Sequence, residues 1–392
     1  MEPVKIKEGI YWVGGIDWDL RNFHGYSTRR GSTYNSYLIL DEKTVLVDTV
    51  KSHLFGEMSQ RAGKVTDLSK IDYIISSHTE MDHSGSLPEI MKLCPDATII
   101  TSPNGEKALR KHYAHSWKTR VVNTGDKLNI GKRTLSFLLM PMVHWPDSMA
   151  TYIAEDRLLM PNDAFGQHIA STERFDSGLE WGVLRSEAAK YYANIVLPYG
   201  AQVSKVLGAV SELDVDTIAP SHGIIWRDHI SEIVGLYKKW ADNVTEDKAV
   251  IVYDTMWHST EKMAEAIFEA FSEKGIKALP MNLETNHISD IIAEMLSAKY
   301  ICVGSPTLNN GLLPSVASFL TYLKGLAPKG RTALAFGSYG WGGQSVDQIE
   351  EIFKSCGFET LEKIKLQWVP SQKELANIKK QVTGDIKQGG EI

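Results

Sequence analysis

Acidic and imidazole side chains at the ends of apolar segments constrain this chain more than any other feature. The motif HTEMDH follows the apolar run Ile71–Ile75, and a further His or Asp follows each of the runs LLMPMV, RLLMPN and DTIAPS. Each run is a predicted strand, and the loops at strand ends are where a scaffold usually places reactive groups. We therefore expect one metal site, and its candidate ligands are His78, Glu80, Asp82, His83, His144, Asp163 and His222.

The spacing within the motif favours convergence of its side chains. Residues two apart on an extended segment point to the same side, so His78, Glu80 and Asp82 are expected to face one way, with His83 turning in beside them. Imidazole and carboxylate groups suit first-row metals, and carboxylate-rich sets favour iron or manganese over thiolate-bound zinc. Any one of the 12 histidines is more often a surface or packed residue than a ligand. The whole set, at strand–loop junctions, is what indicates a metal site.

Size, charge and cysteine content bound the class of protein. At 392 residues and 43.7 kDa the chain suits two domains. A net charge of -6 provides no basic field for nucleic acid or an anionic membrane. The 3 cysteines include no CxxC pair, which argues against a disulfide framework and a fused iron–sulfur module, and favours a reducing compartment. The N-terminus lacks the apolar core of a signal peptide, so we expect a cytoplasmic protein.

The pattern of elements changes near residue 245. Before it, short strands and loops dominate, with helices expected at 86–93, 105–113, 187–196 and 226–243, and the polar stretch 243–248 is a predicted linker. After it, strands alternate with helices. Strands are expected at 249–253, 278–283, 300–304, 332–336 and 361–367, and helices at 260–274, 289–298, 315–325, 345–356 and 371–387. Such alternation predicts a doubly wound parallel sheet, which binds ligands at the carboxyl ends of its strands.

Three loops in this second half are candidates for a flavin site. The loop after the first strand lacks GxGxxG but places Thr255, Ser259 and Thr260 at a helix N-terminus, which suits a single terminal phosphate. The loops 305–311 and 337–343 follow two further strands, with glycines for close backbone approach and Tyr339 or Trp341 to pack on a ring. Turn glycines and ordinary packing are the alternative for each loop alone, whereas the three together favour flavin mononucleotide (FMN). The candidate cofactor-binding residues are Thr255, Met256, Trp257, His258, Ser259, Thr260, Ser305, Pro306, Thr307, Leu308, Asn309, Asn310, Ser338, Tyr339, Gly340, Trp341 and Gly342.

Across both halves, the chain resembles the flavodiiron proteins, the A-type flavoproteins of the rubredoxin:oxygen oxidoreductase kind, over essentially its full length. The resemblance is carried by H-x-E-x-D-H and by the stretches HWPDSM, NDAFGQH and TMWHSTEKMA. It implies an α/β protein with an N-terminal metallo-β-lactamase-like αβ/βα sandwich at 1–245 and a flavodoxin-like FMN-binding domain at 249–392. Hydrolases of the β-lactamase superfamily carry H-x-H-x-D-H and bind zinc. Glu80 at the second histidine position implies a di-iron site instead.

The resemblance also assigns roles to the candidate ligands. It implies that His78, Glu80 and His144 hold one iron, that Asp82, His83 and His222 hold the other, and that Asp163 bridges them. It leaves open whether His83 ligates directly, because the matching residue turns away in some family members. His24 and Tyr26 are the candidate catalytic residues beside the metals, as donors of protons or hydrogen bonds. Further residues that we expect to line the pocket are Trp145, His168 and Tyr192.

The implied activity is an oxidoreductase that reduces dioxygen to water, or nitric oxide to nitrous oxide, in the cytoplasm. Two ferrous irons and one reduced flavin together hold the four electrons that dioxygen requires. Electrons would pass through FMN from a rubredoxin-like or other small donor, and a head-to-tail homodimer, or a dimer of such dimers, would bring flavin and iron together. The alternatives are a primary nitric oxide reductase, a zinc hydrolase fused to a flavodoxin, and an electron carrier whose first domain holds no metal.

Overall fold

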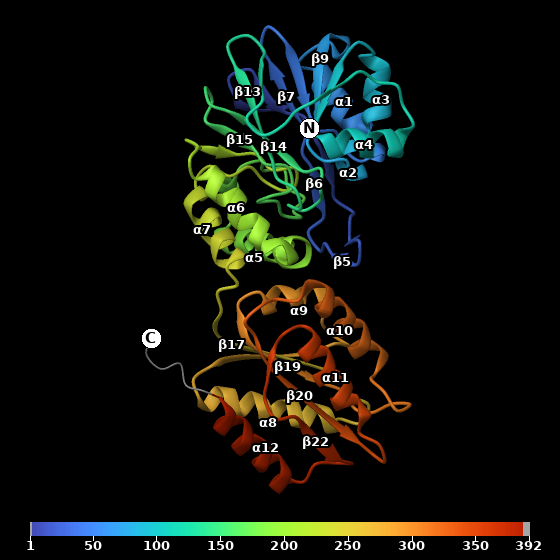
Figure 1. Cartoon of the computed structure of the whole chain (residues 1–392), viewed down its shortest axis with the longest axis vertical. Coiled ribbons are helices and arrows are strands. Elements are labelled where there is room, and N and C mark those ends of the chain that lie inside the picture. The colour runs from blue at the N-terminus through green and yellow to red at the C-terminus, as the bar shows by residue number, and fades with distance from the viewer. Residues whose placement is uncertain (1, 387–392) are drawn as a thin grey trace. The chain divides into compact units, whose positions relative to one another are not determined.

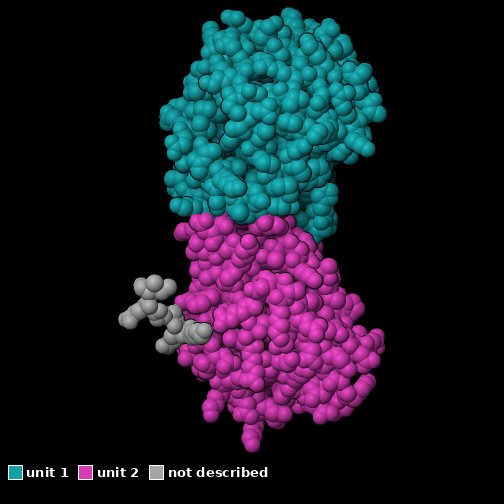
Figure 2. Space-filling model, in the orientation of Figure 1, with its two compact units in different colours: residues 1–191, 199–238 teal, residues 192–198, 239–392 magenta. Residues whose placement is uncertain are grey.

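The computed structural model describes residues 2–386, and the chain divides into two compact units (Figure 2). Unit 1 takes in the chain up to Tyr191 together with Tyr199–Lys238. Unit 2 takes in Tyr192–Pro198 and the chain from Lys239 onward. None of the helices within residues 2–386 has both the length and the apolar character needed to cross a bilayer.

Unit 1 contains two main sheets (Figure 1). The seven-stranded sheet has the order β1-β2-β7-β8-β9-β10-β11, and the five-stranded sheet has the order β12-β13-β14-β15-β16. The strands of the first sheet are β1 Val4–Lys7, β2 Ile10–Trp12, β7 Tyr37–Leu40, β8 Thr44–Val47, β9 Ile71–Ser76, β10 Thr98–Thr101 and β11 Thr119–Val121. Those of the second are β12 Lys127–Asn129, β13 Thr134–Leu139, β14 Met149–Ile153, β15 Leu158–Met160 and β16 Thr217–Ile218. Two small hairpins pair β3 Gly15–Asp17 with β6 Ser32–Tyr34, and β4 Asn22–Phe23 with β5 Tyr26–Ser27.

The period-two alternation of side chains explains the layers of unit 1. In β8, Val45 and Val47 point into a core shared with Phe137 of the second sheet, while Leu46 points into a core with Met58 of helix α1. The seven-stranded sheet is therefore apolar on both faces, one covered by the other sheet and one by helices. The helices of unit 1 are α1 Phe55–Gly63, α2 Met81–Ser84, α3 Leu87–Leu93, α4 Pro103–Tyr113, α5 Trp181–Tyr191, α6 Gly200–Val210 and α7 Ile230–Ala241.

Two predicted helices of the first half have different bounds in the structure. The helix expected at 187–196 starts at Trp181 and ends at Tyr191, where a π-helical segment, Tyr192–Val196, follows. Trp181, Leu184, Ala188 and Tyr191 recur at helical spacing, so the sequence did carry a sign of the earlier start. The helix expected at 226–243 begins only at Ile230. The buried Asp176 accepts hydrogen bonds from the backbone N–H groups of residues 227–229, which fixes these residues outside the helix.

Unit 2 is a parallel sheet of order β18-β17-β19-β20-β21, with β22 also paired to β20. Counted along the chain this is the 2-1-3-4-5 order of flavodoxin-like doubly wound folds. The strands are β17 Glu246–Tyr253, β18 Lys277–Asn282, β19 Ala298–Gly304, β20 Thr332–Tyr339, β21 Glu359–Thr360 and β22 Ile364–Gln367. The helices are α8 Ser259–Glu273, α9 Ile288–Met295, α10 Pro314–Leu326, α11 Gln344–Ser355 and α12 Gln372–Asp385.

Two predictions for this half need correction. The stretch 243–248 is a linker only in part, because β17 starts at Glu246 and pairs there with Ala298 of β19. The strand expected at 361–367 starts only at Ile364, as β22, and the short β21 lies before the expected range; each pairs with a different part of β20. Neither difference affects the cofactor loops, because β17, β19, β20 and β22 all end at the same edge of the sheet.

Candidate metal centre and cofactor cradle

The HTEMDH motif begins after β9 and ends in the one-turn helix α2. The backbone N–H groups of His83 and Ser84 both donate to the carbonyl oxygen of Glu80. The expectation that Asp82 follows His78 and Glu80 on an extended segment is therefore wrong. A helical turn, rather than strand alternation, brings Asp82 and His83 to the other ligands.

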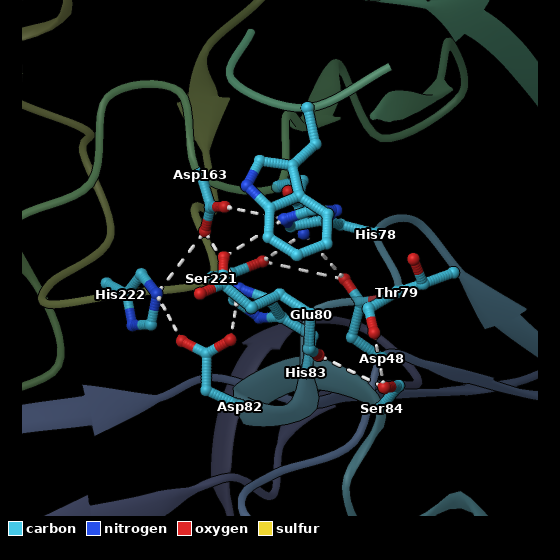
Figure 3. Close-up of polar contacts among 12 residues, drawn as sticks. Asp48, His78, Thr79, Glu80, Asp82, His83, Ser84, Asp163, Ser221 and His222 are labelled. Atoms are coloured by element: carbon cyan, nitrogen blue, oxygen red, sulfur yellow. Dashed lines mark hydrogen bonds and ion pairs between the residues drawn. The ribbon is translucent and has the colours of Figure 1, made fainter. Parts of the chain in front are cut away.

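Asp163 lies at the middle of the candidate ligands, and its two oxygens face different histidines (Figure 3). Its Oδ1 lies 3.0 Å from His83 Nε2 and 3.3 Å from His222 Nε2. Its Oδ2 lies 3.2 Å from His144 Nε2 and 3.8 Å from His78 Nε2. Two groups have ligand atoms that all lie within 4.8 Å of one another: His78, His144 and Asp163, and Asp82, His83 and His222.

The remaining carboxylates divide between these two sides. Asp82 Oδ1 lies 3.3 Å from His83 Nε2, and its Oδ2 lies 3.2 Å from His222 Nε2. Glu80 Oε2 lies 3.3 Å from His78 Nε2 and 3.6 Å from His144 Nε2. The structure thus brings together every candidate ligand named from the sequence, and His83 faces inward with the others.

The buried carboxylates of this cluster require positive charge beside them. Asp82 and Asp163 are buried, and no donor with hydrogen-bond geometry reaches their oxygens within residues 2–386. Burial opposes charge on Asp163, but His83, His144 and His222 hold its pKa well below the usual range. Burial likewise opposes charge on His222, yet Asp163 and Asp82 raise its pKa to about 10. Because buried carboxylates require compensation, a pair of metal cations fits this donor set.

Outer hydrogen bonds orient two of the imidazoles. Asp147 accepts from His78 Nδ1, with both oxygens at 3.2 Å, and also from the Thr79 backbone N–H at 2.7 Å. His222 Nδ1 donates to the Thr33 carbonyl oxygen at 2.8 Å. Each bond fixes the ring so that Nε2 faces inward, as the outer partners of metal-bound histidines commonly do. Sequence reasoning missed Asp147, although it stands in the quoted stretch HWPDSM.

The residues predicted to line the metal pocket do not all lie near the candidate ligands. His24 is largely exposed, at 72% of its side chain, and its Nε2 lies 3.0 Å from Glu80 Oε1. The rings of Tyr26 and His168 are 5.2 Å apart, His168 is 5.1 Å from His222, and Trp145 is 4.9 Å from His78. Tyr192 does not join them, because it belongs to unit 2 and packs on Trp240. Its neighbour Tyr191, which the sequence reasoning missed, contacts His168 and His222 instead.

A cavity of about 530 Å³ opens in unit 2 at the carboxyl ends of β17, β19, β20 and β22. The predicted residues that line it are Met256, Trp257, Ser259, Pro306, Thr307, Asn309, Asn310, Ser338, Tyr339, Gly340, Trp341 and Gly342. Trp368 and Val369 also line it and were not predicted, because the loop after β22 was not considered. The other predicted residues, Thr255, His258, Thr260, Ser305 and Leu308, are not among its lining.

The cradle's contacts fit an aromatic ring and a phosphate. Thr255 Oγ1 is buried without a hydrogen-bond partner within residues 2–386, just before the N-terminus of α8, where backbone N–H groups favour an anion. Trp341 and Trp257 are 88% and 84% exposed at the cavity, which is unusual for tryptophan outside a binding surface. A Cβ on Gly340 would lie 2.9 Å from the Trp368 ring, so a larger residue there would disturb the wall.

Comparisons with known proteins agree with this architecture. The profile of the ODP family beta lactamase matches residues 33–223, and that of flavodoxin matches residues 251–381. The nitric oxide reductase of Moorella thermoacetica is 46% identical over 95% of this chain and 96% of its own length. The rubredoxin-oxygen oxidoreductase of Megalodesulfovibrio gigas is 41% identical over 97% and 96%. The flavodiiron protein of Giardia intestinalis is 32% identical and superposes with a TM-score of 0.96, covering 98% of this chain and 96% of that one.

The chain belongs to the flavodiiron protein family. This confirms the resemblance drawn from the motifs and the α/β fold with a metallo-β-lactamase-like part before a flavodoxin-like part. It also confirms the prediction of an oxidoreductase, the class in which both named bacterial relatives fall. Iron and FMN are the cofactors that this family and its flavodoxin part imply.

Proposed function

We propose that this flavodiiron protein reduces dioxygen to water, and also nitric oxide to nitrous oxide, with electrons passed through FMN. In this proposal residues 1–245 form the di-iron domain and residues 249–392 form the FMN-binding domain. The observation that carries it is the division of the ligands by Asp163, whose two oxygens face two separate pairs of histidines.

Each side of Asp163 would hold one iron. His78, Glu80 and His144 surround the first position, and Asp82, His83 and His222 surround the second, with Asp163 shared. Irons bound there would supply electrons and open coordination positions for a diatomic gas. Glu80 supports iron over a zinc hydrolase, since a carboxylate oxygen replaces a nitrogen donor beside His78 and His144.

The protein's own groups would supply protons and keep the centre apart from solvent. Dioxygen reduction to water consumes protons, and the exposed His24 can exchange them with solvent while its Nε2 contacts Glu80 Oε1. The ligands Asp82, His83, Asp163 and His222 are all buried, whereas Glu80 and His144 are partly exposed, and Glu80 also contacts the exposed His24. We propose His24 as the proton-carrying residue, with Tyr26 packed against His168 behind it.

The cradle of unit 2 would hold FMN, with Ser259 and Thr255 near the phosphate and Tyr339, Trp341 and Trp368 near the ring. Bound FMN supplies a two-electron store that passes single electrons onward. We propose a small protein such as a rubredoxin as the electron donor, a head-to-tail homodimer as the working assembly, and a cytoplasmic location.

The relatives support both gases as substrates. One is named a nitric oxide reductase at 46% identity, and the other a rubredoxin-oxygen oxidoreductase at 41%. Nitric oxide as the primary substrate is therefore the second candidate. Both gases are small and neutral and bind ferrous iron, so ligand identity alone does not choose between them.

Two measurements test the proposal. Protein purified without oxygen is analysed for iron, zinc and flavin, and the chemically reduced protein is then mixed with each gas in turn. Iron together with FMN, and reoxidation by dioxygen faster than by nitric oxide, is the expected result. Faster reoxidation by nitric oxide would establish the second candidate, whereas zinc in place of iron would overturn the di-iron assignment.

A further inference from the structure

The loop that carries the candidate ligand His222 contacts the buried side chain of Asn35. Asn35 Nδ2 donates to the Pro220 carbonyl oxygen at 2.8 Å and to the Gly223 carbonyl oxygen at 3.0 Å. The backbone N–H of Asn35 donates to the carbonyl oxygen of Ser221 at 2.8 Å. Asn35 is only 1% exposed, and it therefore binds this loop from within the core, on both sides of His222.

The third partner of the amide fixes its orientation. Trp12 Nε1 donates to Asn35 Oδ1 at 2.8 Å, and an indole N–H can only donate. The amide oxygen must therefore face Trp12, which leaves both N–H bonds of Nδ2 for the two carbonyl oxygens of the loop. Trp12 is fully buried, and the guanidinium carbons of Arg174 and Arg61 lie 4.6 and 5.1 Å from its ring centre. An aspartate could not make this arrangement, because it has no N–H to donate.

The strand β6 holds the same loop at a second position. His222 Nδ1 donates to the Thr33 carbonyl oxygen, and Thr33 Oγ1 accepts from the Gly223 N–H at 2.7 Å. Gly223 has a φ of 79°, and a Cβ there would lie 1.8 Å from Gln167 Oε1, so the turn after His222 has no room for a side chain. Thr33 thus sets the direction of the imidazole ring, whereas Asn35 sets the path of the backbone that carries it.

We propose that Asn35 is a positioning residue for one half of the metal centre. By fixing the carbonyl groups before and after His222, its amide holds His222 Nε2 at 3.2 Å from Asp82 Oδ2 and 3.3 Å from Asp163 Oδ1. His222 lies with Asp82 and His83 at the second metal position, so replacement of Asn35 should affect that position far more than the first. This inference rests on the proposed metal centre, since it concerns how one of its ligands is held.

The test is iron release from the full-length protein carrying Asn35→Asp. The substitution keeps the shape of the side chain but turns a carboxylate oxygen toward two carbonyl oxygens. The Tyr37 hydroxyl still donates to the Pro220 carbonyl oxygen at 2.6 Å, so the loop keeps part of its support. We expect one of the two irons to leave for a ferrous chelator at least ~10-fold faster than from the wild type, and the other by no more than about threefold faster. An added negative charge alone would hold a cation more tightly, so faster release reports a displaced ligand.

Mössbauer spectra of the iron-loaded protein provide a second measurement, which a general loss of stability would not change. The signal of an iron depends on the geometry of its own ligands. In Asn35→Asp, the signal of one iron should shift while that of the other stays close to its wild-type position. Equal shifts of both signals, or equally accelerated release of both irons, would overturn a role confined to the His222 side.

Asn194→Asp is the matched control. Asn194 is also buried, donates through Nδ2 to the Ser289 carbonyl oxygen at 3.0 Å and accepts at Oδ1 from the Tyr322 hydroxyl at 2.7 Å, but it belongs to unit 2. This control should lose stability while both irons are released within about twofold of the wild-type rate, below the effect of outer partners of a metal ligand. Equal acceleration in Asn194→Asp and Asn35→Asp would reduce Asn35 to a general stabiliser and overturn the proposal.

Trp12→Phe covers the case in which Asn35→Asp does not fold. It keeps an aromatic ring in the core and removes the N–H donor to Asn35 Oδ1, so release of the same single iron should speed up by a few-fold. Wild-type release and spectra in a folded Asn35→Asp, or in Trp12→Phe where that variant does not fold, would overturn the positioning role alone. A wild-type protein that binds no iron would instead overturn the proposed function and this inference with it.

Discussion

The metal centre and the flavin cradle both lie at the ends of strands, but they differ in the burial and the chemistry of their binding groups. In unit 1 the groups that would bind the cofactor are buried imidazoles and carboxylates from segments as far apart as His78 and His222. In unit 2 they lie on loops at one edge of a parallel sheet, and much of the aromatic wall is exposed, with Trp341 at 88%. The buried site depends on charge compensation, whereas the exposed one depends on shape and contact area.

This difference predicts how much binding free energy each site loses when one of its residues is replaced. Removing one charge from the buried cluster leaves other charges without partners, a cost of several kcal/mol that spreads over the whole site. Removing one wall of the cradle leaves the remaining walls in place and costs about as much as the lost contact. The variants below separate these two kinds of failure, from the largest expected effect to the smallest.

Asp163→Asn should have the largest effect. Among the candidate ligands, Asp163 alone places one oxygen toward His83 and His222 and the other toward His144 and His78. An amide cannot bind both sides as an anion, so we expect iron affinity to fall at least ~100-fold, beyond the usual range for outer partners. Iron analysis after dialysis measures the loss, and the FMN content of the same sample is the internal control. A variant that keeps its iron would show that Asp163 does not bridge.

Glu80→His should change the choice of metal more than the total affinity. The substitution restores H-x-H-x-D-H, so the position beside His78 and His144 becomes richer in nitrogen donors. Competition between Fe²⁺ and Zn²⁺ should shift toward zinc on the order of tenfold, about 1.4 kcal/mol. His24→Ala is the control, because it removes the contact to Glu80 Oε1 and leaves Oε2 unchanged. An unchanged metal preference in Glu80→His would contradict the assignment of Glu80 as a ligand.

Trp368→Ala should weaken FMN binding without touching the metal. Trp368 lines the cavity, and its ring lies 6.1 Å from that of Trp341. Loss of one aromatic wall should raise the Kd for FMN about tenfold, or about 1.4 kcal/mol, as measured by quenching of FMN fluorescence. Trp18→Ala serves as the control, since Trp18 is also exposed, at 51%, but lies in unit 1. Equal FMN affinity in Trp368→Ala and the wild type would place the ring elsewhere.

The same contrast explains what could be predicted from the sequence. Metal ligation restricts a position to a few residue types, so His78, Glu80, Asp82 and the other candidate ligands could be proposed from the order of residues, and the structure brings their side chains together. Their local conformation could not, because the single turn of α2 leaves no periodic pattern in four residues. The doubly wound parallel sheet of unit 2 could be predicted from its alternation of strands and helices, which is a long-range pattern rather than a local one.

Residues that support a site through hydrogen bonds could not be recognised from the sequence in this way. Asn35 and Asp147 are ordinary polar residues in the sequence, and their partners include backbone carbonyl and N–H groups that nearly every residue possesses. Trp368 was missed because it stands directly after β22, in a loop that was not considered. Tyr191 and Tyr192 are adjacent on the chain, but neighbouring residues of a helix point in different directions, and only the ring of Tyr191 contacts His168 while that of Tyr192 packs on Trp240.

Ser371→Ala should have the smallest effect and shows whether the two sites are held independently. Ser371 caps α12, with Oγ accepting from the Glu374 N–H, while the Glu374 carboxylate accepts from the Ser371 N–H at 2.8 Å. Ile378 and Val382 of α12 pack in the hydrophobic core of unit 2, so loss of the cap should destabilise unit 2 by about 1 kcal/mol. On heating the full-length protein, release of FMN fluorescence should move to lower temperature while loss of the iron absorption stays unchanged. If both signals move together, the two units unfold as one. The difference between the buried, charged metal centre and the exposed, aromatic cradle would then not extend to the stability of their units.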